Sequence, residues 1–364
     1  MSIKINIGPI HPSTHGAVRF VADVEGDTIK GVELHIGFLH RGVEKLLENR
    51  TYMQSPAYME KLDYVAPLPW DDLYVSAVEK AVKHEVKPDA QLARMILLEF
   101  QRIASHLIWL GTMCNDLGQM YTMFMWTFRD RAKIIRFMEN VAGSRMFYVN
   151  LRIGGLAQPL IPTFKNDAYE LCDYLEDKIK EYPSVLDSSP VFMERMKNVG
   201  ILRKHEAIEY GVSGPVLRAS GVEYDVRKAF PYYFYDKMKF IVPIGRTGDN
   251  YDRYYVRYIE MLQSIKIIRQ ALDLLPDNPD VVGMPTKLIM PPAAKEVVVE
   301  HRELPKGEGI IYMVPDTQKP YRISLRAPSF INFYAVEKIA KNIKFADLFS
   351  IFGNFDILIA EMDR

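Results

Sequence analysis

The sequence has no excess of either charge. Its 46 Lys and Arg residues balance 46 Asp and Glu residues over 364 positions. A balanced chain lacks the long-range positive field that draws proteins to DNA, RNA or anionic lipid. We therefore expect no nucleic-acid partner. With 48% hydrophobic residues, the chain is also too apolar for a disordered tail and long enough to bury a large core.

Cysteine is scarce. Cys114 and Cys172 are the only two, too few for a disulfide framework or for a site with three or four thiolate ligands. We therefore expect a chain in contact with the cytosol that binds no metal or iron–sulfur cluster by itself.

Long hydrophobic runs are absent as well. The most apolar stretch, residues 105–128, is divided by Asp116 into two uncharged pieces, each shorter than the roughly 18 residues that span a bilayer. The N-terminal sequence MSIKINIGPIHPSTHG lacks the apolar core of a signal peptide. The nucleotide-binding patterns GxGxxG and GxxxxGK are also missing. We expect no nucleotide site, and any membrane association to come through partner subunits.

What the sequence does contain is a hydrophobic period that changes along the chain. Residues 3–36 alternate in short runs, which predicts a small antiparallel sheet. Farther along, apolar residues recur at spacings of three and four, with Pro88 as a start and Gly143 as a stop. This pattern predicts long helices at residues 88–113, 121–143, 166–181 and 251–274. Strand-like runs return at residues 295–304, 309–314 and 321–327.

The predicted fold class is therefore α+β with a bundle of long helices at its centre. We expect an N-terminal β domain with a site loop at residues 1–40 and a helix-bundle core at residues 41–280. The C-terminal α+β region, residues 281–364, should pack on that core.

Two histidines, His11 and His15, share the turn-rich loop GPIHPSTHG. The HxxxH spacing would suit a metal only on a helix, and Pro12 and Gly16 argue against a helix there. Both imidazoles could instead hold the loop by local hydrogen bonds, because a neutral histidine can satisfy backbone groups through both nitrogens. A role in proton transfer is the third interpretation.

Asp116 is a carboxylate within the most apolar helical region. Burying it unpaired would cost several kcal/mol, so it needs a cationic or hydrogen-bonding partner, for which a histidine is suitable. The turn formers Asn115 and Gly118 beside it also allow the end of a helix. Tyr64 is core by default, although a tyrosine hydroxyl can donate to a carbonyl oxygen in an apolar pocket.

Arg41 and Glu44 are three residues apart in HRGVEKLLEN. On one helical face this spacing predicts, by default, a surface ion pair.

Several longer segments follow one another in a fixed order: GPIHPSTHG, HIGFLHRGVEKLLENRTY, YMEKLDYV, GSRMFYVNLRIGG, GPVLRASGVEYDVRK and GNFDILIAEMDR. Together they resemble the quinone-site core subunit of respiratory complex I, the 49 kDa type, called the D subunit in bacteria and the H subunit in plastid-type enzymes. That family is itself related to the large subunit of nickel–iron hydrogenases, so the resemblance implies a hydrogenase large-subunit-like fold. It spans residues 7–364.

The resemblance implies roles for particular residues. His15 and Tyr64 match the two residues that flank the quinone headgroup, and Asp116 matches an aspartate that pairs with that histidine. Together these three would be the catalytic set. Arg41 and Glu44, in the RGxE motif, match residues near the iron–sulfur cluster of an adjacent subunit. Arg145 would lie near the same cluster, next to its terminal position in the electron path.

This chain departs from hydrogenases where they hold nickel and iron with two CxxC pairs. Asp63 and Ala66 stand at the first pair, and Leu358 and Glu361 at the second. None supplies the soft thiolates that such a centre requires, so we expect no hydrogen-evolving metal site.

Two further departures concern the cluster region. Phe147 stands where many respiratory members have a histidine, so we expect less proton coupling at the cluster and a lower potential, which suits a low-potential quinone such as menaquinone. Lys61 stands where arginine is common, which keeps the charge but not the planar fork.

The resemblance thus implies a core subunit of a proton-pumping quinone oxidoreductase of the translocase type, with NAD(P)H, ferredoxin or deazaflavin as the donor. Quinone would be the substrate. The expected partners are an iron–sulfur small subunit of the B or PSST type, a C-type 30 kDa-like subunit and membrane-arm subunits. The chain would lie peripherally on the cytoplasmic or stromal face of an energy-transducing membrane. The alternative is a non-catalytic scaffold subunit, against which the retained His15, Tyr64 and Asp116 weigh.

Overall fold

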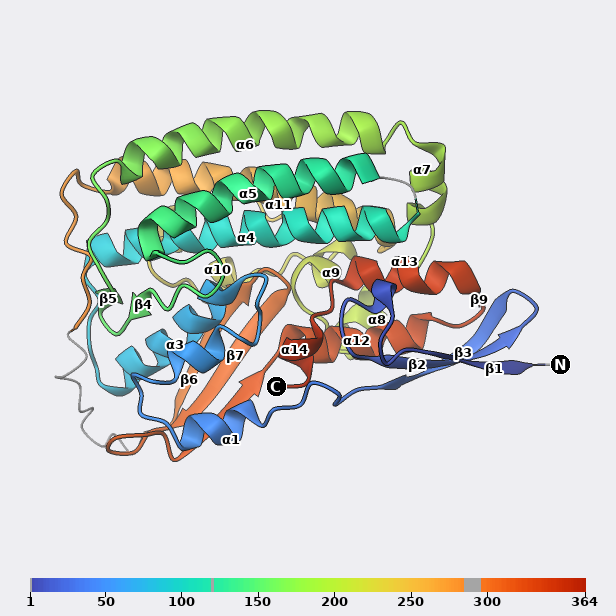
Figure 1. Cartoon of the computed structure of the whole chain (residues 1–364), viewed down its shortest axis with the longest axis horizontal. Helices are drawn as coiled ribbons and strands as arrows, with labels where there is room; N and C mark the ends of the chain where they lie inside the picture. The colour runs from blue at the N-terminus through green and yellow to red at the C-terminus, as the bar shows by residue number, and fades with distance from the viewer. Residues whose placement is uncertain (1, 119–120, 285–295) are drawn as a thin grey trace.

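The computed structural model of the chain describes residues 2–118, 121–284 and 296–364. An antiparallel sheet lies at the N-terminal end, in the order β1 (Ile3–Ile7), β2 (Arg19–Glu25), β3 (Thr28–His35) and β9 (Ile343–Lys344) (Figure 1). Alternate residues of β2 are buried, as expected of a sheet with one covered face. The predicted N-terminal sheet is confirmed, and the C-terminal part of the chain adds its fourth strand.

Four long helices form the bundle and lie side by side in Figure 1. They are α4 (Pro88–Asp116), α5 (Tyr121–Ala142), α6 (Phe164–Leu186) and α11 (Asn250–Leu274). Pro88 occupies the first turn of α4, and Gly143 follows α5 with a positive φ of 74°. The four predicted long helices are confirmed to within a few residues, apart from α6, which extends five residues farther at its C-terminal end.

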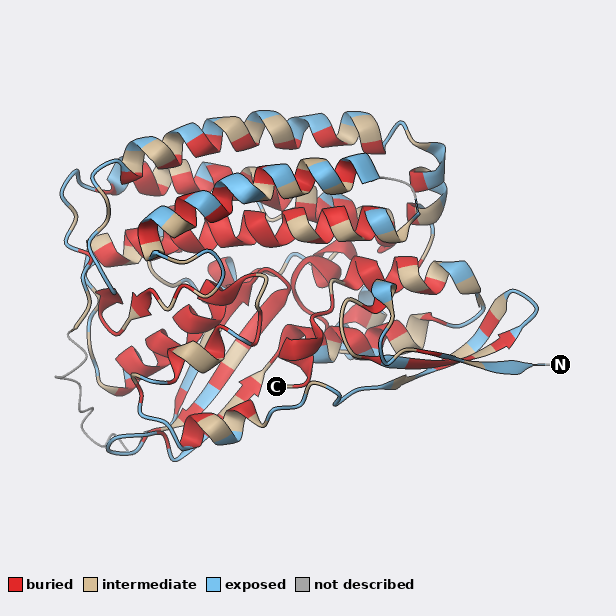
Figure 2. Ribbon diagram, in the orientation of Figure 1, coloured by how far each residue is buried: buried red, intermediate tan, exposed pale blue. Residues whose placement is uncertain are grey.

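The helices of the bundle differ in how many sides are covered. α4 contacts α5 and α11 and is buried along most of its length, whereas α6 shows an exposed face (Figure 2). α4 therefore lies at the centre of the bundle, and its C-terminal end carries Asp116.

A second antiparallel sheet consists of β6 (Val298–Leu304), β7 (Gly307–Val314) and β8 (Arg322–Arg326). It packs against α3 (Pro67–Ala81). These strands confirm the strand-like runs predicted near the C-terminus, except that residue 295 lies outside the described residues.

Short elements connect these layers. They are α1 (Val43–Glu48), α2 (Pro56–Met59), β4 (Leu151–Arg152), β5 (Gly155–Leu156), α7 (Pro190–Met196), α8 (Lys204–Glu209), α9 (Gly214–Ala219), α10 (Val226–Ala229), η2 (Tyr235–Lys237), α12 (Pro328–Ile339), α13 (Phe345–Phe355) and α14 (Ile359–Met362). Within the described residues, no helix is both long and apolar enough to cross a membrane.

The buried side chains form two main clusters. The larger joins the bundle to α3 and the second sheet. The other joins the N-terminal sheet to α9 and to α12, α13 and α14 near the C-terminus. The α+β class is confirmed, and the division at residues 40 and 280 stays a prediction.

Candidate functional site

The loop between β1 and β2, residues 8–18, carries both histidines. A single 3-10 turn, η1 (Pro12–Thr14), lies between them. His11 Nδ1 accepts a hydrogen bond from the backbone N–H of Ser13 at 3.2 Å, and its ring stacks on Phe349 of α13. His11 therefore has the local structural role that was one of the three interpretations.

His15 leaves this turn with a positive φ of 52°. Its Nε2 lies 2.7 Å from Oδ2 of Asp116, and the two side chains are 27% and 7% exposed. Asp116 is the last residue of α4, where the negative end of the helix dipole adds to the attraction for a cationic imidazole. The partner expected for the buried carboxylate is present, and it is a histidine.

Tyr64 lies half-buried in the segment between α2 and α3. Within the described part of the chain, its hydroxyl makes no hydrogen bond. Burial raises the pKa of Tyr64, and the negative charge of Asp63 adds to the effect. The phenol therefore stays protonated and has its hydroxyl available to a ligand.

Lys306 lies at the turn between β6 and β7 and is 2% exposed. Its Nζ is 3.1 Å from Asp63 Oδ2, 3.2 Å from Ser105 Oγ and 3.9 Å from Asp356 Oδ2. Burial lowers the pKa of Lys306, but Asp356 and Asp63 outweigh it and keep the pKa above its usual value. The side chain is therefore a buried cation.

The buried charges around Lys306 connect the two predicted quinone residues. Tyr64 interacts electrostatically with Asp63, Lys306 and Asp356, and Asp356 in turn interacts with His15. The structure thus brings His15 and Tyr64 to the same group of buried charges, although they come from different loops.

The residues at the positions of the hydrogenase cysteines lie beside this group. Asp63 Oδ1 accepts hydrogen bonds from the backbone of Val65 and Ala66 at 2.9 and 3.0 Å. Glu361 is fully buried, accepts from Ser329 N at 2.8 Å, and lies 3.4 Å from Trp70 Nε1. Burial, with a contribution from Asp63, raises the pKa of Glu361 to about 7.

Lys306 was missed by the sequence analysis. The residue stands between Pro305 and Gly307, in a turn that connects two strands. A lysine in such a turn is normally exposed, so the sequence carries no signal that this one is buried.

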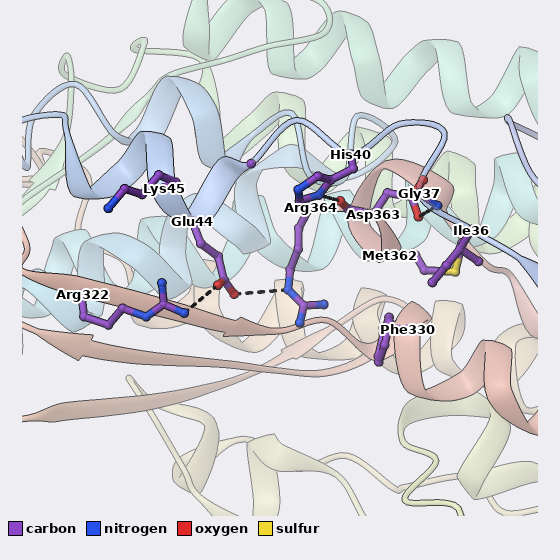
Figure 3. A pocket seen from close by; sticks show the side chains of 11 residues that line it. Ile36, Gly37, His40, Glu44, Lys45, Arg322, Phe330, Met362, Asp363 and Arg364 are labelled. Carbon is purple, nitrogen blue, oxygen red and sulfur yellow. Dashed lines mark hydrogen bonds and ion pairs between the residues drawn. The ribbon is translucent and has the colours of Figure 1, made fainter.

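The expected surface pair of Arg41 and Glu44 is wrong. α1 begins only at Val43, so Arg41 precedes the helix and its guanidinium donates to the carbonyl of Lys61 at 2.9 Å. Glu44 faces another way. Figure 3 shows it between Arg322 and Arg364, with N–O distances of 3.2 and 3.3 Å.

The same two arginines line a surface cavity of about 410 Å³, together with Gly37 and His40. Asp363 closes one side, because its carboxylate accepts hydrogen bonds from the backbone of Gly37 and Leu39 at 2.9 Å each (Figure 3). The C-terminal residues of the chain are thereby fixed to the segment that follows β3.

Arg145 lies in the turn after α5 and is exposed, with its guanidinium 3.3 Å from Glu139. In the same turn, the ring of Phe147 lies 5.5 Å from Lys61 Nζ. The two residues in which this chain departs from the usual pattern are therefore neighbours. Arg41, Lys61 and Arg145 place three positive charges along this edge, whereas Glu44 lies in the cavity beside Arg364.

Metal ligands do not gather anywhere in the described ranges: no group of three or more His, Cys, Asp or Glu side chains there is arranged to hold an ion. Cys114 and Cys172 are free and buried. Burial raises the pKa of both thiols, which keeps them protonated.

Comparison with known proteins identifies relatives along the whole chain, all of them D subunits of NADH-quinone oxidoreductases. The one numbered 2 in Solibacter usitatus is 42% identical over 363 residues, covering 100% of this chain and 97% of the relative. That of Dehalococcoides mccartyi, strain ATCC BAA-2266, is 43% identical over 364 residues, covering 100% and 98%. That of Desulforamulus reducens is 42% identical over 362 residues, covering 99% and 97%.

The family model of the 49 kDa subunit of respiratory-chain NADH dehydrogenase matches residues 116–364, from the aspartate that pairs with His15 to the C-terminal arginine. This match and the full-length relatives agree with the geometry around His15. The chain belongs to the family of 49 kDa subunits of the respiratory-chain NADH dehydrogenase.

Proposed function

We propose that this chain is the quinone-site core subunit of a proton-pumping, complex I-like oxidoreductase. The names of its relatives, which are D subunits of NADH-quinone oxidoreductases, support this function. The chain supplies one side of the quinone pocket, and an iron–sulfur small subunit of the B or PSST type supplies the other. The C-type 30 kDa-like subunit and the membrane-arm subunits are the remaining partners.

The observation that carries the proposal is the contact between His15 and Asp116. Reduction of a quinone to a quinol takes two electrons and two protons, and two O–H bonds form. The partner's iron–sulfur cluster supplies the electrons. His15 donates a proton to one carbonyl oxygen and Tyr64 donates to the other, while Asp116 holds the His15 ring in orientation and stabilises its cationic form.

The edge that carries Arg41 and Arg145 faces the partner's cluster in this proposal. The exposed guanidinium of Arg41 is held by the carbonyl of Lys61, so its charge is directed outward. Glu44 belongs to the same region, but its pairing with Arg364 ties it to the C-terminal residues of its own chain.

The subunit would be a peripheral protein on the cytoplasmic or stromal face of an energy-transducing membrane, held there by its partners. Its donor is NADH, ferredoxin or deazaflavin. The bundle and the two sheets are those of a hydrogenase large-subunit-like fold in which carboxylates have replaced the metal-binding thiolates. Asp63 and Glu361, both buried near Lys306, support that replacement.

The test is made in the assembled complex with Tyr64→Phe and His15→Ala. Each variant removes one proton donor, so quinone reduction should fall by about 10²-fold, the lower end of the effect of a general acid. Reduction of the partner's cluster by the electron donor, followed by electron paramagnetic resonance, should be unchanged. Tyr321→Phe and His205→Ala are matched controls, because both side chains are exposed.

Normal quinone turnover in both variants would refute the assignment. It would favour the scaffold alternative, in which the chain only docks other subunits. A direct assay of nickel in the purified protein tests the hydrogenase-type centre, and we expect none.

A further inference from the structure

Two carboxyl groups meet beneath the segment that carries Tyr64. Glu60 follows α2, Asp71 lies in the first half of α3, and both are fully buried. Their side chains are in hydrogen-bonding contact with each other. Within the described part of the chain, neither oxygen of Asp71 and only one oxygen of Glu60 receives a donor from any other residue.

Two ionised carboxylates cannot form this contact, since both would be acceptors. One proton shared between them supplies the missing donor and removes the repulsion of two buried charges. Burial raises the pKa of Asp71 well above its usual value, and the charge of Glu60 raises it further. Burial likewise raises the pKa of Glu60.

The surrounding charges do not replace that proton. Arg152 and Lys61 act on the pair only through longer-range attraction. Asp72 adds a negative charge nearby, but its carboxylate is already bound by Arg302 at 2.7 Å. Tyr148 is neutral, because burial raises its pKa to about 12.

The second oxygen of Glu60 holds the turn after α5. It accepts a short hydrogen bond from the backbone N–H of Val149. Val149 has a φ of 41°, which a β-branched residue adopts only when its surroundings enforce it. Glu60 is therefore one of the contacts that keep this turn in a strained conformation.

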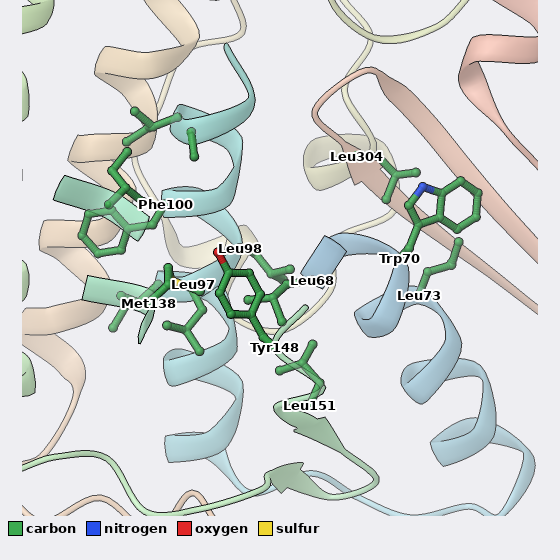
Figure 4. Packing of buried hydrophobic residues seen from close by; sticks show 14 of the residues in the cluster. Leu68, Trp70, Leu73, Leu97, Leu98, Phe100, Met138, Tyr148, Leu151 and Leu304 are labelled. Atoms are coloured by element: carbon green, nitrogen blue, oxygen red, sulfur yellow. The ribbon is translucent and has the colours of Figure 1, made fainter. Parts of the chain in front are cut away.

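Tyr148 anchors the same turn from the inside. Its ring lies in the core between α4 and the start of α3 (Figure 4). Its hydroxyl accepts from Gln101 Nε2 at 3.3 Å and donates to the carbonyl of Arg145 at 3.4 Å. With the inner side fixed in this way, Arg145 is exposed and Phe147 lies against Lys61.

We propose that Glu60 and Asp71 are positioning residues, whose single shared proton clamps the turn of residues 145–149 to the segment that carries Lys61 and Tyr64. This proposal rests on the proposed function, in which the turn faces the partner's cluster and Tyr64 faces the quinone. Loss of the proton leaves two like charges in contact, so the clamp opens at alkaline pH and the distance between cluster and quinone site is no longer fixed.

The test compares Asp71→Asn and Asp71→Leu in the assembled complex. The asparagine amide donates to Glu60 permanently, in place of the proton, whereas leucine removes both donor and acceptor. We expect wild-type quinone reduction to fall reversibly at alkaline pH and this fall to disappear in Asp71→Asn. In Asp71→Leu the rate should be about tenfold lower at every pH, because a misplacement well below 1 Å is costly. Asp236→Asn, at an exposed carboxylate, is the control.

Infrared spectroscopy gives a second readout that needs no quinone. The wild-type complex should show the band of a protonated buried carboxyl group, and Asp71→Asn should lack it. An alkaline fall that is the same in Asp71→Asn as in wild type, or a spectrum in which that band does not change, overturns the proposal. If Asp71→Leu does not assemble, the comparison of Asp71→Asn with wild type still decides. Failure of the proposed function shows differently, as normal turnover in His15→Ala.

Discussion

Two groups of buried charges in this chain are balanced in different ways. In the bundle, each carboxylate contacts a guanidinium, with N–O distances of 2.6–3.1 Å that join Arg218 to Glu260 and Glu303, and Arg227 to Asp225 and Glu99. Near the proposed quinone site, one ammonium group serves several carboxyls. Lys306 contacts Asp63 and lies 3.9 Å from Asp356, whereas Glu361 is stabilised by Ser329 N and Trp70.

The protonation of the two groups differs accordingly. Burial raises the pKa of Glu260, but Arg218 and His106 outweigh burial and hold it far below the usual value. Glu361 has no such neighbour, and burial raises its pKa to about 7. Carboxylates matched by arginines therefore keep a fixed charge, whereas a carboxyl without a close cation exchanges its proton near neutral pH.

The largest effect is expected from breaking the matched group. Arg218→Met leaves Glu260 and Glu303 buried without their guanidinium, which should cost about 3–5 kcal/mol in the free energy of unfolding. Urea denaturation of the chain measures this cost, and Arg246→Met, at an exposed arginine, is the control. A loss below about 1 kcal/mol would mean that the matched group contributes no more than a surface pair.

A smaller effect is expected from Glu361→Gln. Because the folded pKa of Glu361 is raised to about 7, folded chains hold this proton longer than unfolded ones, and the free energy of unfolding falls as pH rises from about 4 to about 7. The isosteric glutamine removes that fall, which amounts to about 2 kcal/mol. Thermal or urea unfolding across this pH range measures it. Glu194→Gln, at an exposed carboxylate, should leave the slope as in wild type, and an unchanged slope in Glu361→Gln would refute the assignment.

The smallest effect concerns the outer edge, where Lys61 faces an aromatic ring instead of a carboxylate. Phe147→His places a titratable group beside the partner's cluster. The midpoint potential of the cluster should then depend on pH, by up to about 59 mV per pH unit for one coupled proton. Wild type should show little dependence in an electron paramagnetic resonance titration. A steep wild-type slope would show that Phe147 does not remove proton coupling, and Phe230→His serves as a distant control.

Regular elements could be predicted from the sequence because their signals are local. Pro88 and Gly143 mark helix ends, and the apolar period of the bundle helices is long. Local signals fail between residues 41 and 87, where helical spacing predicted a helix through Arg41 and the chain instead forms the short α1, α2 and α3. β9, with two residues, carries no pattern long enough to detect.

The candidate site could be predicted only in part. The cost of burying Asp116 predicts a partner without naming it, and only resemblance connected it with His15. The pairs of Lys306 with Asp63 and of Glu60 with Asp71 arise from segments that meet in the fold, and no spacing in the sequence indicates them. Long-range contacts between ordinary residue types are the part that sequence reasoning does not reach.

The contact between β3 and β9 has a consequence for biogenesis. Residues 28 and 29 pair with residues 343 and 344, and Asp363 binds the backbone of Gly37 and Leu39. During synthesis, the first three strands therefore wait for nearly the whole chain before their open edge is covered. An unpaired edge of this kind invites aggregation, so the nascent subunit should depend on a chaperone that shields its N-terminal sheet until the ribosome has released the last helix.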